Sequence, residues 1–217
     1  MLERLWALLY PPRCVLCRKF LKKEETDLCA DCRKDAPDFT KAKSRIPFVA
    51  GWTALWYYKD NPRESVLRFK FGNKRHYALA YGRLLGIRLL KDMPEGFDLI
   101  AYVPTGSLRV FTRGYDQARL LAEATAAELG YAVTPVLKKI RNTPPQSRIR
   151  DAAKRRANVL GAYIVTDPAI VKDKRILLLD DVITTGATCS ECAKTLLIQG
   201  AKEVFCAAVA AASHDKK

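Results

Sequence analysis

The chain has 217 residues, of which 49% are hydrophobic, so it is long enough for one medium-sized domain with a small appendage and is not disordered as a whole. Lysine and arginine outnumber aspartate and glutamate by 38 to 23, which gives a formal net charge of +15. This excess favours an anionic partner. The charge alone leaves nucleic acid, phosphorylated metabolites and an anionic membrane face as alternatives.

The N-terminus is apolar but short. Its first residues, MLERLWALLY, predict an amphipathic helix that stops at Pro11 and Pro12. No apolar run reaches the roughly 18 residues needed to span a bilayer, and the start lacks a signal-peptide cleavage site. We therefore expect a cytoplasmic protein that is not integral to a membrane, and we leave open a peripheral contact of this helix with a membrane or a partner.

Four of the seven cysteines form two C-x-x-C pairs, Cys14 with Cys17 and Cys29 with Cys32, separated by 11 residues. Two tight turns of this kind direct four thiolates to one point, which is the tetrahedral arrangement that Zn²⁺ prefers. Such a site has no open coordination position, so we predict a structural zinc that stabilises a segment with little core of its own. A redox pair or an unmetallated cysteine-rich turn is the alternative.

The rest of the chain alternates between predicted strands and helices. Strands are expected at 48–58, 97–104, 131–137, 161–165, 175–181 and 203–212, and helices at about 60–72, 74–92, 115–130 and 187–200. This alternation predicts an open, mainly parallel α/β sheet with helices on both faces. We therefore divide the chain into an N-terminal helix with a zinc knuckle (1–40) and an α/β domain (41–217).

The stretch 175–188, RILLLDDVITTGAT, places two carboxylates at the end of a buried strand and a threonine-rich turn after them. Ligands of open α/β sheets bind beyond the carboxyl ends of the strands, which is where Asp180 and Asp181 fall. The backbone N–H groups of the turn and of the following helix predict a phosphate site, with Gly186 permitting close approach. Because the acids would repel phosphate, we expect them to meet sugar hydroxyls of the same ligand, with Mg²⁺ nearby. The plainer alternative is a helix cap and a turn without a ligand.

This stretch resembles the signature of type I phosphoribosyltransferases, which bind phosphoribosyl pyrophosphate (PRPP) with Mg²⁺. The segments RGYDQARLLA (113–122) and RNTPPQSRIRDAAKRRANVLGAY (141–163) resemble elements of the ComF family, competence-associated proteins that are phosphoribosyltransferase-like. The double C-x-x-C start is similar as well. The resemblance covers nearly the whole chain and implies a type I phosphoribosyltransferase-like fold with a role in DNA uptake and natural transformation.

The resemblance also assigns site residues. Asp180 and Asp181 would hold the ribose hydroxyls and are the expected catalytic pair, the turn after them would hold the 5-phosphate, and the loop 105–114 would hold the pyrophosphate. The residues assigned to PRPP are Asp180, Asp181, Ile183, Thr184, Thr185, Gly186, Ala187, Thr188, Thr105, Gly106, Arg109 and Arg113. Arg109 as a solvated loop residue is the alternative for that position. Lys70 is expected near the site, with a role on the helix surface as its alternative.

Residues 138–158 correspond to the mobile hood that closes over PRPP in this family. Its cationic side chains are Lys138, Lys139, Arg141, Arg148, Arg150, Lys154, Arg155 and Arg156. Two or three arginines suffice for one pyrophosphate, so we expect this segment to bind single-stranded DNA as well. The aromatic residues between 52 and 58 are expected to pack in the core.

Two functions remain open at this stage. The first is a PRPP-binding protein of DNA uptake, with single-stranded DNA and proteins of the competence machinery as partners. The second is an enzyme that transfers phosphoribose from PRPP to a base or amine acceptor. The sequence has no evident base-recognition element after its last strand, so the acceptor stays unidentified.

Overall fold

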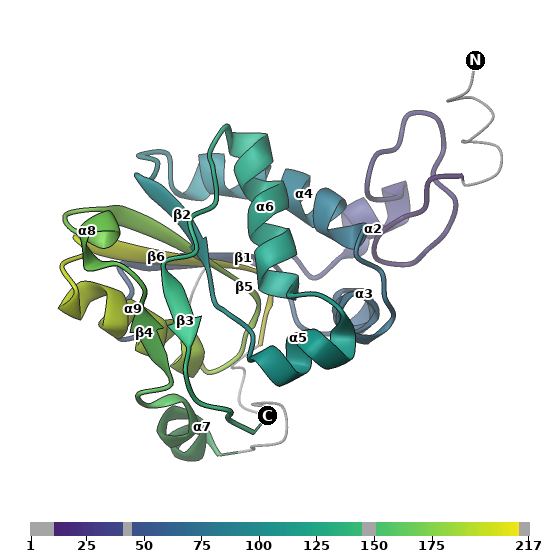
Figure 1. Cartoon of the computed structure of the whole chain (residues 1–217). Helices are drawn as coiled ribbons and strands as arrows, with labels where there is room; N and C mark the ends of the chain where they lie inside the picture. The colour runs from purple at the N-terminus through teal and green to yellow at the C-terminus, as the bar shows by residue number, and fades with distance from the viewer. Residues whose placement is uncertain (1–10, 41–44, 145–150, 213–217) are drawn as a thin grey trace.

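A computed structural model describes residues 11–40, 45–144 and 151–212 (Figure 1). Its main sheet has four parallel strands in the order β1-β6-β5-β2. These strands are β1 (Gly51–Tyr57), β2 (Leu99–Tyr102), β5 (Arg175–Ile183) and β6 (Glu203–Ala211). A second sheet pairs β3 (Leu137–Lys139) antiparallel with β4 (Tyr163–Val165). The predicted mainly parallel sheet is therefore confirmed.

Helices cover both faces of the parallel sheet, as expected. Adjacent residues of a strand point to opposite faces, and β5 uses both. Leu177 and Leu179 are buried in a core shared with α3 (Asp60–Phe71), α4 (Tyr77–Asp92) and α6 (Gln117–Leu129). Ile176 and Leu178 are buried in a second core with α9 (Ala187–Ile198). Both faces of β5 are therefore covered along residues 176–179, and the partly exposed Asp180 and Asp181 follow toward its carboxyl end.

Local capping explains the bounds of the helix predicted at 115–130. The carboxylate of Asp116 accepts hydrogen bonds from the backbone N–H groups of Ala118 and Arg119 at 3.1 and 3.3 Å, so α6 begins there. The helix ends at Gly130, which has the left-handed conformation (φ 75°) that glycine adopts without steric cost.

Some segments differ from the prediction. Residues 105–114 are expected to form a loop, but most of them form α5 (Ser107–Arg113), which ends at Gly114 with φ 76°. The strand expected at 131–137 is wrong except for Leu137 and a bridge between Ile100 and Val133, because Pro135 has no N–H to donate to a ladder. Three further short helices of the described residues were not predicted: α2 (Ala30–Asp35), α7 (Ala152–Val159) and α8 (Pro168–Val171).

The cysteine-rich segment, with α2 (Ala30–Asp35), docks on α3 and α4. The Ser65 hydroxyl of α3 donates to the carbonyl oxygen of Val15 at 2.5 Å, and the Arg68 guanidinium donates to that of Leu16. On α4, Arg83 forms an ion pair with Asp27. The side chains of Val15 and Leu16 are buried in the same core as α3 and α4, so this segment completes a core rather than standing apart.

Two predictions about the N-terminal part reach beyond these residues. The helix expected at the start falls on residues 1–10, outside the described part of the chain, and the boundary proposed at residue 40 stays a prediction. In the described ranges, every helix is too short or too polar to cross a membrane.

Candidate functional site

A cleft of about 410 Å³ lies beyond the carboxyl end of β5. Its floor is the stretch from Asp180 to Cys189, and its walls come from α3, α5, α7 and the small β3-β4 sheet. The residues assigned to PRPP that line it are Thr105, Arg109, Arg113, Asp180, Asp181, Ile183, Thr184, Thr185, Gly186, Ala187 and Thr188. The fold therefore brings together two segments that are about 70 residues apart in the sequence.

The two aspartates have different electrostatic environments. Asp181 Oδ1 lies 2.8 Å from Lys70 Nζ, in an ion pair whose side chains are only 13% and 19% exposed, respectively. Asp180 Oδ1 accepts a hydrogen bond from the backbone N–H of Asp181 at 2.8 Å. Burial, together with the neighbouring Asp181 charge, raises the pKa of Asp180 to about 8. Asp180 therefore retains its proton to a higher pH than an exposed carboxyl group does, beside the ion pair of Asp181 with Lys70.

The turn between β5 and α9 has the geometry of an anion site. Gly186 has φ 72°, and a Cβ added there would lie 2.7 Å from Ile46 Cγ1, so both the backbone and the packing require glycine. The first N–H groups of α9 have no acceptor within the helix, and this end of the helix carries a partial positive charge. Thr185 Oγ1 already accepts one of them, from Ala187, at 3.4 Å. The remaining donors lie where a phosphate would enter.

The opposite wall of the cleft is cationic. Arg109 on α5 donates to the carbonyl oxygen of Thr143 at 2.8 Å, and Lys139 lies over the Tyr163 ring at 5.4 Å from Nζ to the ring centroid. Burial and the charge of Arg113 lower the pKa of Arg109, and burial and the charge of Arg109 lower that of Lys139. An anionic ligand would stabilise the charged forms of Arg109 and Lys139, which their burial and their neighbouring positive charges disfavour.

The loop before α5 is anchored by Asp116. Its carboxylate accepts hydrogen bonds from the backbone N–H of Thr105 at 2.8 Å and from the Thr105 hydroxyl at 3.2 Å, while it caps α6. Burial raises the pKa of Asp116. Gly106 is the assigned residue that does not line the cleft. It has an ordinary φ of −63°, and an added Cβ would meet no protein atom closer than 3.5 Å, so the fold itself does not require glycine there.

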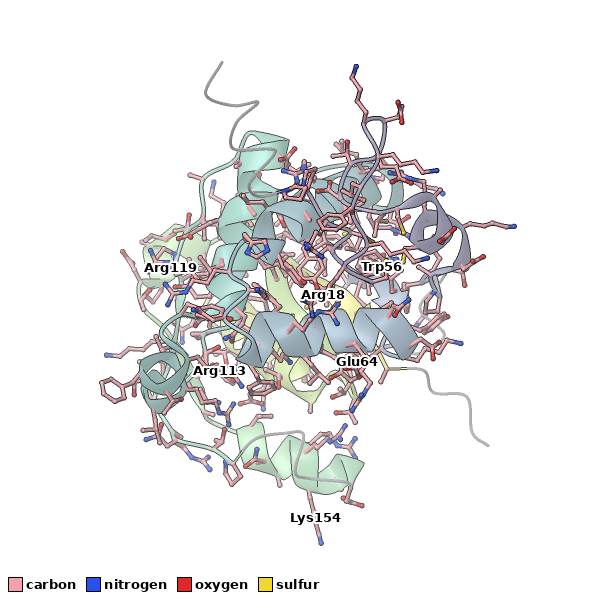
Figure 2. The ribbon with its side chains drawn as sticks, turned by 90° about the vertical axis from the view of Figure 1, so that its right-hand side faces the viewer. Arg18, Trp56, Glu64, Arg113, Arg119 and Lys154 are labelled. Carbon is pink, nitrogen blue, oxygen red and sulfur yellow. The ribbon has the colours of Figure 1, made fainter. Side chains whose placement is uncertain are left out.

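The side chains predicted to bind DNA fall into two groups. Lys139 and Arg155 line the cleft. Lys138, Arg141, Lys154 and Arg156 are exposed. In Figure 2, Lys154 points away from the body of the protein. Arg148 and Arg150 lie outside the described residues.

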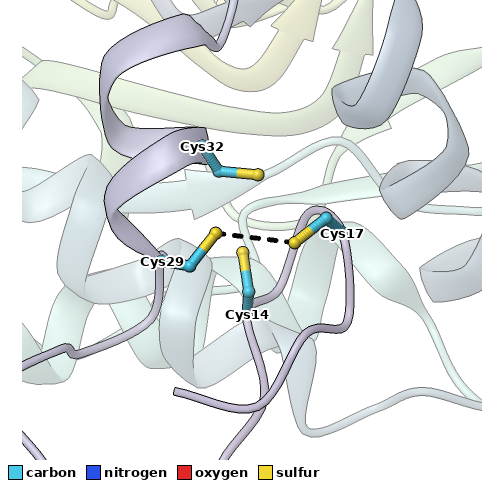
Figure 3. Close-up of side chains that lie close together, drawn as sticks. All are labelled: Cys14, Cys17, Cys29 and Cys32. Atoms are coloured by element: carbon cyan, nitrogen blue, oxygen red, sulfur yellow. Dashed lines mark hydrogen bonds between the residues drawn. The ribbon is translucent and has the colours of Figure 1, made fainter. Parts of the chain in front are cut away.

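The four patterned cysteines converge as expected (Figure 3). The sulfur atoms of Cys14, Cys17, Cys29 and Cys32 lie within 4.8 Å of one another, and those of Cys17 and Cys29 are 3.5 Å apart. Tetrahedral Zn–S bonds of about 2.3 Å require sulfurs about 3.8 Å apart, so the set fits zinc. Burial and the neighbouring sulfurs raise the pKa of Cys32, so a bound cation would stabilise the thiolate form of this residue.

Two families of known domains match this chain. The phosphoribosyl transferase domain family matches residues 93–217, more than half of the chain, and the double zinc ribbon domain matches residues 5–43. The chain is 28% identical to competence protein F of Haemophilus influenzae, over 88% of this chain and 93% of that protein. It is 31% identical to the DNA utilization protein YhgH of Escherichia coli K12, over 88% of this chain and 86% of that protein. The chain belongs to the ComF family.

The ComF assignment confirms the resemblance and the phosphoribosyltransferase-like fold, and the zinc ribbon match identifies the four cysteines as a structural zinc site. Among solved structures, the chain is similar to glutamine phosphoribosylpyrophosphate amidotransferase from B. subtilis, complexed with ADP and GMP, with a TM-score of 0.44 and 20% identity. That match covers 65% of this ComF chain and 30% of the amidotransferase.

Sequence reasoning gave Lys70 no defined role and overlooked Arg63, Phe71 and Tyr163. All four line the cleft. The sequence could have placed the α3 residues together, because positions 63, 67, 70 and 71 lie on one face of an α-helix. The position of Tyr163 depends on how β4 pairs with β3, which the sequence pattern does not reveal.

Removal of zinc is expected to destabilise the cysteine-rich segment that packs on α3 and α4. We expect Cys29→Ser to lose bound zinc, measured by elemental analysis, and to lower the melting temperature by ~10 °C, because the metal supplies folding free energy to residues that share a core with α3. Cys192→Ala is the control, since Cys192 is buried outside the cluster and its loss should leave the zinc content intact. A wild-type protein that carries no zinc and a Cys17–Cys29 disulfide would contradict the assignment.

The raised pKa of Asp180 makes stability depend on pH. The unfolded chain releases this proton near pH 3.8 and the folded chain near pH 8, so the contribution of Asp180 to stability falls as pH rises through that window. Asp180→Asn removes the buried charge. Relative to wild type, it should raise the melting temperature by ~2–6 °C more at pH 9 than at pH 5. Asp173→Asn, at an exposed position, should show no such difference; an equal change at both pH values for Asp180→Asn would refute the assignment.

Proposed function

We propose that this chain binds PRPP in the cleft at the end of β5. The observation that carries the proposal is the separation of charge there: two acidic groups lie beside an N–H-rich turn, with arginines on the facing wall. Asp180 and Asp181 would accept hydrogen bonds from the ribose 2- and 3-hydroxyls. The turn from Thr184 to Thr188 would hold the 5-phosphate, and Arg109 with Arg113 would neutralise the pyrophosphate.

Lys70 acts as an internal counter-ion in this scheme. Without a ligand it neutralises Asp181 across 2.8 Å, and a ribose that donates to Asp181 would compete for the same carboxylate oxygen. Lys70 would then be free to turn toward the negatively charged end of the ligand. The carboxylates are hard oxygen ligands of the kind that Mg²⁺ prefers, and Mg²⁺ bound with PRPP would neutralise part of the pyrophosphate charge.

We further propose that the chain acts in the cytoplasm in DNA uptake and natural transformation. The support is the naming of its relatives, competence protein F and DNA utilization protein YhgH. Exposed cations beside the cleft would contact the phosphates of single-stranded DNA: Lys138, Arg141, Lys154 and Arg156. Proteins of the competence machinery would be its partners in this process.

The alternative is an enzyme that transfers phosphoribose. A base or amine nitrogen would form a bond to ribose C1 while the bond from C1 to the pyrophosphate oxygen breaks and pyrophosphate leaves. Arg109 and Arg113 would stabilise the negative charge that develops on the leaving group. Pyrophosphate release that depends on an added acceptor would favour this alternative over binding alone.

Binding of PRPP is tested by calorimetry in the presence of Mg²⁺. The double variant Asp180→Asn/Asp181→Asn should bind PRPP roughly 10- to 100-fold more weakly, because a hydrogen bond to the ion-paired Asp181 contributes about 1.5–3 kcal/mol, one to a neutral Asp180 about 0.5–1.5 kcal/mol, and the amides retain part of both. Asp173→Asn, exposed and outside the cleft, should bind as the wild type does. Equal affinity of the double variant and the wild type would remove the basis of the proposal.

Binding of DNA is tested by fluorescence anisotropy with a labelled single-stranded oligonucleotide over a salt series. Affinity should fall with salt, with a slope of about 0.7 per neutralised phosphate. Lys154→Ala/Arg156→Ala should reduce that slope by ~1.4. Lys91→Ala/Lys202→Ala, at exposed positions away from α7, should leave it unchanged. A wild-type affinity that does not respond to salt would argue against the DNA part of the proposal.

A further inference from the structure

One aromatic side chain in the cleft is exposed without an evident structural reason. Phe71 is the last residue of α3 and 67% exposed, and it lines the cleft with Arg63, Leu67 and Lys70 from the same helix. The opposite side of α3 buries Val66 and Phe69 completely. The helix therefore places one phenylalanine in the core and a second one at the edge of a charged cleft.

The ring of Phe71 is held by an anchored arginine. The guanidinium carbon of Arg113 lies 4.8 Å from the centroid of the Phe71 ring, and Arg113 Nη1 donates to Gln117 Oε1 at 2.8 Å. Gln117 is 1% exposed, so the amide that holds the arginine is fixed in the core. Figure 2 shows Arg113 beside one end of α3. Arg113 thus supports one side of the ring, while the side chain as a whole remains open to solvent.

Phe71 lies next to the sugar-binding part of the cleft. It follows Lys70, whose ammonium group is 2.8 Å from Asp181. Six cationic side chains line the cleft against two acids: Arg63, Lys70, Arg109, Arg113, Lys139 and Arg155. Cationic side chains continue from the cleft onto the exposed surface of α7, at Lys154 and Arg156. A flat apolar face beside a track of phosphate-binding groups is the combination by which proteins bind single strands.

We propose that Phe71, supported by Arg113 and bordered by Leu67, is a stacking shelf for a nucleobase of single-stranded DNA. This inference rests on the proposed function, because it names the part of the strand that the cleft itself would bind. Every base has a π-face, so the shelf would bind bases with little regard to sequence. The phosphates that flank the stacked base would lie against Arg63 on one side and the cations of α7 on the other.

Two oligonucleotides separate stacking from charge: oligothymidylate and a strand of the same length without bases. The readout is fluorescence anisotropy at moderate salt. Wild type should bind oligothymidylate about 5- to 100-fold more tightly than the abasic strand, the range that one stacked base provides. Phe71→Ala should lose most of this difference and leave the affinity for the abasic strand unchanged. Phe71→Trp should retain the difference, because the larger ring also stacks.

The control is Phe111→Ala. Phe111 lies on α5, is 86% exposed and does not line the cleft, so its loss should not change the preference for bases. An unchanged preference in Phe71→Ala would overturn the shelf and leave PRPP and DNA binding standing. A wild type that binds neither strand would overturn the DNA part of the proposed function and the shelf with it. An effect of Phe71→Ala on free nucleotides but not on strands would also overturn it, in favour of an acceptor-base site.

Discussion

The cleft depends on how the chain keeps two adjacent carboxylates at the end of a buried strand. Two negative charges at Asp180 and Asp181, both partly removed from water, repel each other and cost solvation free energy. The fold limits this cost with the ion pair between Lys70 and Asp181 and with the raised pKa of Asp180, which retains a proton. In the proposed complex, the hydroxyls of a ribose would donate hydrogen bonds to the same oxygens and so replace interactions that the two acids make in the fold.

The position of Lys70 depends in turn on how α3 is fixed. One side of this helix contacts the cysteine-rich segment through Ser65, whose hydroxyl also shares a 2.6 Å hydrogen bond with the buried Tyr81, and through Arg68. The other side presents Lys70 and Phe71 to the cleft. The zinc knuckle supplies no reacting group. Its contribution is to fold a small segment against α3, which fixes the wall of the cleft that faces the acids.

The parts of the site that could be predicted from sequence are those encoded within a few residues. The stretch from Asp180 to Thr188 combines the end of a strand, two acids and a turn that requires glycine. This local pattern was sufficient to predict that the stretch lines a cleft. The four cysteines are likewise encoded by spacing. In contrast, the ion pair of Lys70 joins residues 111 positions apart and depends on how α3 crosses the end of β5. The helix α5 was missed because the family resemblance places a pyrophosphate loop at 105–114, whereas residues 107–113 form a helix that ends at Gly114.

If both ligands bind as proposed, the cleft would distinguish PRPP from DNA, because different parts of it would contact the sugar, the phosphates and the base. A ribose has both the 2- and 3-hydroxyls, whereas deoxyribose lacks the 2-hydroxyl, so only PRPP can donate to both Asp180 and Asp181. DNA would gain less binding free energy from the two acids and more from the walls of the cleft, where its phosphates would meet the cations of the cleft and of α7 and a base would stack on Phe71. Since both ligands would use Arg113, one for its pyrophosphate and the other for the support it gives to Phe71, they would compete for that side chain. The acids at the end of β5 would therefore favour PRPP, and the two flanking helices, α3 and α7, would favour the single strand.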